Sequence, residues 1–391
     1  MKEELQKEFR SRFEQDASYF FFCPGRVNLI GEHIDYNGGR VLPCAISLGS
    51  WIAVARNNEK KLRFHSLNFP EKAELHLQTS YSRSGKAWFN YPLGVVNALL
   101  QRDACISGMD LLYFGDLPIG AGLSSSASIE MATCFALNEI FDIGISRTDM
   151  AQLCKSVENN FIGVNSGIMD QFAVAMGKKD HALLLDCDTL EHEYIPFRTG
   201  DYGLVIINSN KKRELADSKY NERFSECGAA LRTLRREVEI EHLCDLDPAR
   251  FEMHRHLIED PVLQKRALHV VTENARVRDA VIALQTGDIE TFGKLLYASH
   301  ESLREWYEVS GKELDTIVDF CKTFAGCAGA RMTGAGFGGC AIALVRNSVV
   351  EEFSQLLVKH YRDRIGYDPE PFASAIGDGV RRINASGLRE R

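Results

Sequence analysis

A run of glycine and serine residues between positions 117 and 128, LPIGAGLSSSAS, separates a predicted strand from a predicted helix. The strand is MDLLYF (109–114), and the helix continues with 3.6-residue periodicity to residue 141. Glycine lets the backbone approach a ligand closely, and a helix N-terminus offers unpaired N–H groups and the positive end of its dipole. Four serines at the start of one helix exceed what an N-cap needs. The pattern therefore favours phosphate binding over its alternative, a plain capped turn.

A second glycine-rich segment, GAGFGG at 334–339, matches the G-x-G-x-x-G spacing of dinucleotide-binding turns. That motif requires a helix after the turn, whereas CAIALV (340–345) has the composition of a strand. We therefore expect a tight loop placed close to a ligand or to another backbone segment, and no dinucleotide site. The chain also lacks a Walker A loop and the H-R-D and D-F-G motifs of protein kinases.

A third segment, PGRVNLIGEHIDYNGGR at 24–40, concentrates polar side chains between glycines. Glu32, His33 and Asp35 lie within four residues of one another and close to Arg26. Carboxylate and imidazole groups in one turn can pair with neighbouring sugar hydroxyls. A solvated polar turn and a chance His-x-Asp metal site are alternatives that composition alone leaves open.

The order of predicted elements indicates an α+β fold. Residues 18–115 carry mostly strand signals, whereas helical patterns cover 124–141, 146–161, 213–238, 261–285, 289–306, 312–324 and 349–364. Ser146 is a candidate N-cap. Strands and helices do not alternate regularly, which argues against a doubly wound parallel sheet. A length of 391 residues fits two or three domains, and we expect two, residues 1–195 and 196–391.

Charge and cysteine content limit the partners and the compartment. Lysine and arginine number 46 against 54 acidic residues, a balance that disfavours nucleic-acid and anionic-membrane binding. The eleven cysteines form no C-x-x-C pair, which is typical of reduced thiols in the cytoplasm. The first thirteen residues predict an amphipathic helix without the apolar core of a signal peptide, and no apolar run is long enough to span a membrane.

Together, and in this order, the three segments resemble the galactokinase family of the GHMP sugar- and metabolite-kinase superfamily. The loop PIGAGLSSSAS resembles the ATP loop of the superfamily, and TGAGFGG resembles its third motif. GRVNLIGEHIDYNGG and GIMDQF (167–172) are similar to motifs of the galactokinase branch, as are DHALLLDC (180–187) and INSNKKRELADSKYN (207–221). The resemblance extends from about residue 20 to at least residue 345. It implies a ribosomal-protein-like N-terminal domain and a ferredoxin-like C-terminal domain, with the active site between them.

The resemblance implies a role for each matching residue. Asp170 falls at the catalytic aspartate, and Arg26 at the arginine that stabilises the transferring phosphoryl group. An arginine beside a carboxylate favours its ionised form, which can accept a hydroxyl proton. The implied sugar-binding residues are Glu32, His33, Ile34, Asp35 and Tyr220. For Asp170 alone a helix cap, and for Tyr220 alone an ordinary helix-face aromatic, would be the simpler interpretation.

The resemblance also implies ATP as co-substrate and Mg²⁺ as cofactor. The nucleotide-binding residues would be Ser66, Gly120, Ala121, Gly122, Leu123, Ser124, Ser125 and Ser126. Ser126 and Glu158 would be the Mg²⁺ ligands, a hydroxyl and a hard carboxylate oxygen, as this ion prefers. The aromatic side chains at 88, 89 and 91 could border an adenine pocket, but we interpret them as core.

The activity implied by the resemblance is transfer of the ATP γ-phosphoryl group to the C1 hydroxyl of galactose, the first committed step of galactose metabolism. Two alternatives are a kinase for N-acetylgalactosamine and a non-catalytic sensor of galactose and ATP. The sensor is disfavoured because the serine run 124–128 is intact and Arg26, Glu158 and Asp170 are all present. We expect a cytoplasmic protein that is a monomer rather than an obligate oligomer.

Overall fold

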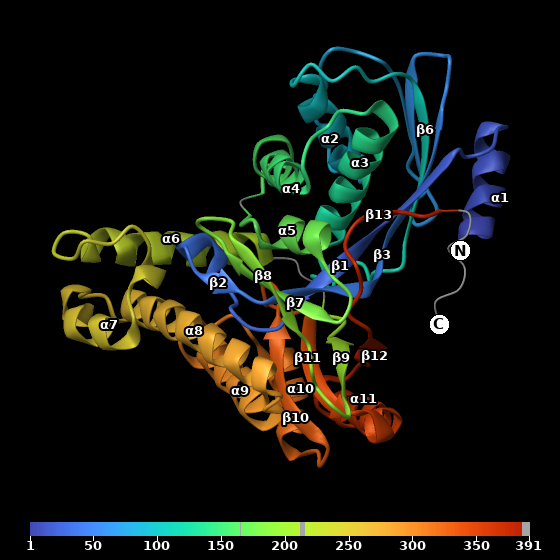
Figure 1. Ribbon diagram of the computed structural model, residues 1–391. Helices are drawn as coiled ribbons and strands as arrows, with labels where there is room; N and C mark the ends of the chain where they lie inside the picture. Colours follow the sequence, from blue (N-terminus) through green and yellow to red (C-terminus); the bar gives the residue numbers. More distant parts are fainter. Residues whose placement is uncertain (165, 212–215, 385–391) are drawn as a thin grey trace.

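The computed structural model describes residues 1–164, 166–211 and 216–384, and it contains three sheets within these ranges (Figure 1). The largest sheet has six strands in the order β13-β1-β3-β6-β4-β5, and only the β4–β6 pair is parallel. Its strands are β1 (Tyr19–Asn28), β3 (Pro43–Arg56), β4 (Lys61–Ser66), β5 (Ala73–His76), β6 (Met109–Gly115) and β13 (Arg381–Arg382).

Residues along each strand point alternately to the two faces of this sheet. Apolar side chains lie on both faces, and helices cover both. Phe20 of β1 packs with Leu5 and Phe9 of α1 (Lys2–Phe13), whereas Phe21 points into the main core on the other face. Figure 1 shows α1 on one side of the strands and α3 on the other. The helices on the main-core side are α2 (Asn90–Leu100), α3 (Ser125–Phe141), α4 (Arg147–Ser156) and α5 (Met169–Met176).

The second half of the chain forms an antiparallel four-stranded sheet, in the order β10-β11-β9-β12, with its own helices. The strands are β9 (Tyr202–Asn208), β10 (Cys327–Thr333), β11 (Cys340–Arg346) and β12 (Glu370–Ser374). The helices are α6 (Ala216–Leu234), α7 (Pro248–His254), α8 (Pro261–Thr286), α9 (Ile289–Glu305), α10 (Lys312–Thr323) and α11 (Val350–Ile365). A three-stranded sheet of β2 (Arg40–Val41), β7 (His181–Asp186) and β8 (His192–Pro196) lies beside the first sheet, where β7 contacts β3.

Most predicted elements are confirmed, including the strand after the second glycine run and the Ser146 cap, whose side chain accepts a hydrogen bond from the Asp149 N–H. The structure differs from the sequence predictions in two places. The expected strand region contains α2, where Pro92 is tolerated because first-turn N–H groups have no helical partner. The helix expected over 146–161 changes at Val157 into a six-residue π-helix, Val157–Ile162. The start of the predicted helix 213–238, at residues 213–215, lies outside the described residues.

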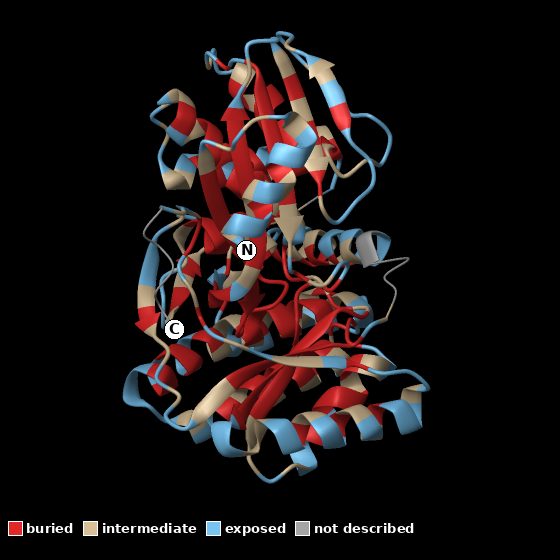
Figure 2. Cartoon of the chain, turned by 90° about the vertical axis from the view of Figure 1, so that its right-hand side faces the viewer, coloured by how far each residue is buried: buried red, intermediate tan, exposed pale blue. Residues whose placement is uncertain are grey.

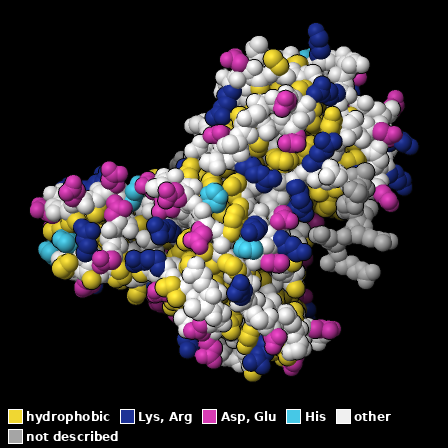
Figure 3. All heavy atoms as spheres, viewed as in Figure 1, with side chains coloured by type: hydrophobic (Ala, Val, Ile, Leu, Met, Phe, Trp, Pro, Cys, Tyr) yellow, Lys and Arg dark blue, Asp and Glu magenta, His cyan; other side chains and the backbone are white. Residues whose placement is uncertain are grey.

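The core runs through both halves of the chain, as the continuous buried regions in Figure 2 indicate. We propose the domain boundary at residues 195 and 196, at the end of β8 and just before the first strand of the four-stranded sheet. The C-terminal end crosses back over this boundary, because β13 pairs with Phe21 and Phe22 of β1. On the face seen in Figure 3, basic and acidic side chains are interspersed. Within the described ranges, no helix has the length and apolar character needed to cross a membrane.

Candidate active site

The three glycine-rich segments meet at one cavity of about 360 Å³. Gly334 and Ala335 of the second segment lie between the other two: the Gly334 N–H donates to Glu32 Oε2 at 2.9 Å, and a Cβ on Gly334 would lie 3.1 Å from the Gly122 carbonyl oxygen. The cavity is lined by residues from all three segments, from the 158–170 region and from α6, and most of their side chains are polar: Arg26, Glu32, His33, Asp35, Gly120, Gly122, Ser124, Ser125, Ser126, Glu158, Gly163, Val164, Ser166, Gly167, Met169, Asp170, Tyr220, Asn221, Gly334 and Ala335. Segments far apart in sequence thus form one polar site.

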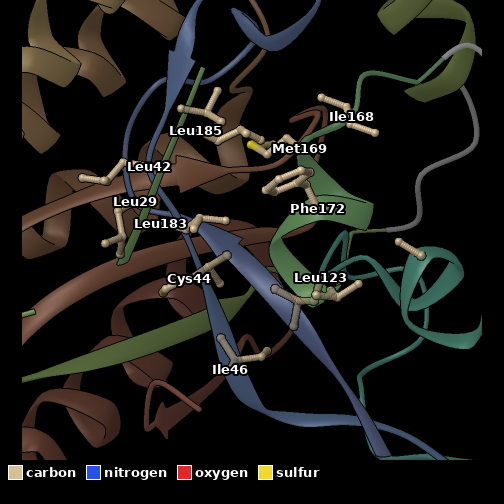
Figure 4. Close-up of a cluster of buried hydrophobic side chains, with 14 of the residues drawn as sticks. Leu29, Leu42, Cys44, Ile46, Leu123, Ile168, Met169, Phe172, Leu183 and Leu185 are labelled. Atoms are coloured by element: carbon tan, nitrogen blue, oxygen red, sulfur yellow. The ribbon is translucent and has the colours of Figure 1, made fainter. Parts of the chain in front are cut away.

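Asp170 and Arg26 form a bidentate ion pair in this cavity. Arg26 Nε donates to Asp170 Oδ1 and Nη2 donates to Oδ2, both at 2.8 Å, and Nη1 donates to the Gly122 carbonyl at 2.7 Å. The Arg26 side chain is 5% exposed but that of Asp170 is 31% exposed, so the carboxylate remains open to a ligand. Their buried neighbours fix these positions, since Met169 and Leu123 belong to the hydrophobic cluster drawn in Figure 4.

Ser124 was predicted to bind nucleotide, and in this structure its hydroxyl donates to Asp170 Oδ2 at 2.6 Å. Ser124 is the N-cap residue of α3, yet its side chain makes no capping bond and its backbone is left-handed, with φ 62°. Such strain in a non-glycine residue is often found at functional sites. Ser124 therefore links the predicted phosphate loop to the predicted catalytic aspartate.

The other residues of the predicted ATP loop precede α3 or lie in its first turn. Gly120 and Gly122 have positive φ values of 73° and 76°, which glycine adopts without strain. Ser125 and Ser126 lie in the first turn of α3, where N–H groups and the helix dipole favour an anion. Two members of the loop, Ala121 and Leu123, are buried and do not line the cavity. The Leu123 carbonyl instead accepts from the Arg26 N–H at 3.2 Å.

Glu158 lies in the π-helix, a distortion that is frequent at functional sites. Its Oε2 accepts from Gln171 Nε2 at 2.9 Å, and Ser126 and Ser166 also hydrogen-bond to its carboxylate. Burial raises the pKa of Glu158 despite these donors, and the nearby Asp170 charge raises it further. A bound cation would offset the unfavourable free energy of burying the ionised Glu158 carboxylate. One carboxylate and one hydroxyl, completed by phosphate oxygens and water, form the hard-oxygen ligand set of Mg²⁺, so the residues present fit this ion.

Glu32 forms a buried ion pair that the sequence did not predict. Arg331 of β10 is fully buried, and its Nη2 donates to Glu32 Oε2 at 3.0 Å while Nη1 donates to the Asn28 and Leu29 carbonyls. Glu32 Oε1 accepts a long hydrogen bond from Asn28 Nδ2 at 3.4 Å and, since Glu32 lines the cavity, can also accept from a ligand hydroxyl. Arg331 precedes the second glycine segment in sequence, but only the folded chain brings it to residue 32.

His33 and Asp35 both line the cavity, and burial keeps the uncharged form of each side chain favoured. Both His33 ring nitrogens have partners: Nε2 donates to the Ala335 carbonyl at 3.1 Å, which leaves Nδ1 to accept from the Tyr36 hydroxyl at 2.9 Å. Burial lowers the pKa of His33 to about 3, so the ring is neutral. Burial, reinforced by the Asp170 and Glu32 charges, raises the pKa of Asp35 to about 7.

Of two further predicted sugar-binding residues, Tyr220 lines the cavity and Ile34 does not. Tyr220 of α6 lines the cavity, with its ring centroid 5.5 Å from that of His33. Ile34 is fully buried and does not line the cavity; a Cβ on Gly39 would meet its side chain at 2.9 Å. Its place in the predicted run reflects sequence position rather than contact with the cavity.

A second cavity of about 160 Å³ adjoins the first, and Ser125 and Ser126 line both. Its walls are mostly apolar and include Phe69, Trp88, Tyr91, Tyr113, Phe114, Leu117, Ile119 and Ile129. Ser66, which was predicted to contact the nucleotide, lines this cavity and accepts from the Asn68 N–H at 3.0 Å. Our interpretation of the aromatic side chains at 88 and 91 as core was incomplete, because both pack against the core and also line this cavity.

Family models match this arrangement segment by segment. The GHMP kinases N terminal domain matches residues 90–178 and the GHMP kinases C terminal model matches 280–363, and these ranges contain the phosphate loop, Asp170 and the second glycine segment. A crystal structure of mevalonate kinase has a similar fold, with a TM-score of 0.66 at 23% identity over 92% of this chain and all of that one. The fold and the site thus define a two-domain GHMP kinase.

The galactokinase galactose-binding signature matches residues 7–56. This range includes residues 31–35, here called the sugar loop because residues 32–35 are predicted to bind the sugar. Galactokinase of Clostridium tetani is 48% identical over 381 residues, 97% of each chain, and that of Enterococcus faecalis is 48% identical over 98% of this chain and all of its own. The structure of Lactococcus lactis galactokinase complexed with galactose superposes with a TM-score of 0.95 at 42% identity, covering 97% of this chain and 99% of that one. The chain belongs to the galactokinase family.

Proposed function

We propose that this galactokinase-family chain transfers the γ-phosphoryl group of ATP to the C1 hydroxyl of galactose, giving galactose 1-phosphate and ADP. The observation that carries the proposal is the Arg26–Asp170 pair, which lies where the sugar loop and the phosphate loop line one cavity. The apolar second cavity, which shares Ser125 and Ser126 with the first, has the character of an adenine site.

In the mechanism that follows, Asp170 is the general base. Its Oδ1 accepts from Arg26 Nε and has a second lone pair that can accept from the sugar hydroxyl, while Oδ2 accepts from Arg26 and Ser124. As the C1 oxygen bonds to the γ-phosphorus, its proton passes to Asp170. The bond from that phosphorus to the β–γ bridging oxygen breaks, and ADP leaves with the electron pair. Arg26 stabilises negative charge in the cavity, and it is fixed by its third contact, to the Gly122 carbonyl.

Ser126 and Glu158 would hold Mg²⁺, which supplies neutralisation of phosphate charge when bound. Gln171 and Ser166 orient the Glu158 carboxylate for this task. On the sugar side, the Glu32 and Asp35 carboxylates line the cavity and can accept from sugar hydroxyls, and Tyr220 lines the same space. We further propose a monomer, since residues of one chain line both cavities, and a cytoplasmic location, supported by eleven free cysteines.

A coupled ADP-release assay with galactose, ATP and Mg²⁺ tests the proposal. We expect wild-type turnover, and for Asp170→Asn a kcat lower by at least 10²-fold, because a positioned general base contributes about 10²–10⁴. Asp319→Asn, at an exposed position of α10, is the matched control and should retain activity. Undiminished turnover of Asp170→Asn would refute the base assignment. Equal or better kcat/KM with N-acetylgalactosamine would favour that sugar, and binding without turnover would favour a sensor.

A further inference from the structure

Helix α8, from the second half of the chain, holds the peptide groups on both sides of Glu32. Glu273 Oε1 accepts from the Gly31 N–H at 2.9 Å and from the Glu32 N–H at 3.2 Å. One helical turn away, His269 Nε2 donates to the Glu32 carbonyl at 3.1 Å. Residues four apart lie on the same face of a helix, so the two side chains act on one short stretch of the sugar loop.

Both side chains are themselves held in place. Ser299 of α9 donates to Glu273 Oε1 at 2.6 Å, and Arg276 donates to Oε2 at 2.7 Å. The His269 ring carries its proton on Nε2, which donates to the Glu32 carbonyl. Its Nδ1 therefore accepts from the Ser302 hydroxyl of α9 at 2.8 Å. Burial lowers the pKa of His269 to about 4, so this tautomer carries no charge.

The loop also packs too closely against α8 to move without breaking these bonds. Gly31 has φ 95°, and a Cβ there would lie 2.9 Å from Val277 of α8 and 2.9 Å from the Arg40 carbonyl oxygen. Directly after Gly31, Glu32 begins the cavity-lining stretch that includes His33 and Asp35. The direction of the Glu32 peptide therefore decides where the side chains of residues 32, 33 and 35 point.

Neither α8 side chain reaches the ligand space. His269 and Glu273 are fully buried, and neither lines the cavity. Their contacts with the sugar loop are to its backbone alone, unlike Arg331, which contacts the Glu32 carboxylate directly. An effect of these residues on sugar binding would thus pass through the loop.

We propose that His269 and Glu273 are positioning residues for sugar recognition, fixing the Glu32 peptide from its carbonyl and amide sides so that the sugar-binding side chains converge on one substrate. This inference rests on the proposed function, because it takes the 32–35 loop as the sugar site. It places part of the sugar specificity in α8, a helix that contributes no lining residue to the cavity where the three glycine-rich segments meet. Loss of the His269 donor should weaken sugar binding and leave the nucleotide site unchanged.

The test compares His269→Leu, which removes the donor, with His269→Gln, whose amide can donate at similar reach. We expect the KM for galactose to rise about tenfold in His269→Leu, the KM for ATP to stay within twofold, and His269→Gln to recover most of the loss. Glu273→Gln keeps an acceptor for both amides but loses the charge pair with Arg276. Glu273→Leu, which removes the acceptor as well, should raise the KM for galactose more than Glu273→Gln does and keep the KM for ATP within twofold.

Val281→Ala, in the core on the same helix, controls for lost stability and should leave both KM values unchanged. If His269→Leu does not fold, Ser302→Ala, which frees the His269 ring, should still raise the KM for galactose two- to threefold. An unchanged KM for galactose, or a parallel rise for ATP, would overturn the inference. Wild-type protein without galactose turnover would instead refute the proposed function, so the two failures are distinguishable.

Discussion

Replacing Gly167 with alanine tests whether the Asp35 carboxylate must lie where the structure has it. A Cβ on Gly167 would lie 2.6 Å from Asp35 Cγ and closer still to Oδ2. Carbon atoms in contact prefer 3.5–4.0 Å, so the carboxylate must move by about 1 Å. A displacement of that size can cost about 10²-fold in rate. We expect kcat/KM for galactose to fall about 10- to 100-fold, which is about 1.4–2.7 kcal/mol.

The assay is steady-state ADP release with galactose and ATP varied in turn. The KM for galactose should carry the loss, and the KM for ATP should not change. Gly377→Ala is the matched control, because a Cβ there meets its nearest atoms at an ordinary 3.5 Å and 3.9 Å. In an Asp35→Ala background the added methyl group has no carboxylate to displace, so the two substitutions should not be additive. Wild-type kinetics in Gly167→Ala, or full additivity, would refute the reasoning.

Three further outcomes follow from the site and its surroundings. Trp88→Ala should raise the KM for ATP about tenfold without changing that for galactose, since stacking on a base is worth about 1–3 kcal/mol; steady-state kinetics check this, and a selective effect on galactose would contradict it. Burial raises the pKa of Asp35 to about 7, so its carboxylate is the ionised acceptor only above that pH. The KM for galactose should therefore rise as pH falls through about 7, and Asp35→Asn should lose this dependence. Glu130 is fully buried, neither of its carboxylate oxygens has a hydrogen-bond partner among the residues that the structure describes, and burial raises its pKa well above the ordinary value. Because the unfolded state ionises above about pH 4.5 while the folded state stays protonated, Glu130 costs stability increasingly as pH rises. Glu130→Met should raise the free energy of unfolding at pH 7 by about 1–3 kcal/mol, less near pH 4.5, and urea denaturation that shows no gain would contradict this.

Local patterns in the sequence were enough to predict much of the fold. Helix α3, the strand after the second glycine run and the Ser146 cap depend on periodicity and turn residues within about twenty positions. The π-helix at Val157–Ile162 could not be predicted from such patterns, because the helical periodicity of the sequence continues through it without interruption. Its bulge is favoured by the tertiary contacts of Glu158 with Gln171, Ser126 and Ser166.

The sequence by itself was enough to predict which side chains carry the chemistry, since its resemblance to galactokinase motifs assigns roles to Arg26, Asp170 and the sugar loop. Only the tertiary structure decided how they act together. It turned the Ser124 hydroxyl onto Asp170 and removed Ile34 from the cavity. It also brought Arg331, His269 and Glu273 from the second half of the chain to the sugar loop. These contacts join residues more than 230 positions apart. Such pairs leave no local pattern, because burial and hydrogen bonding select partners by their position in space.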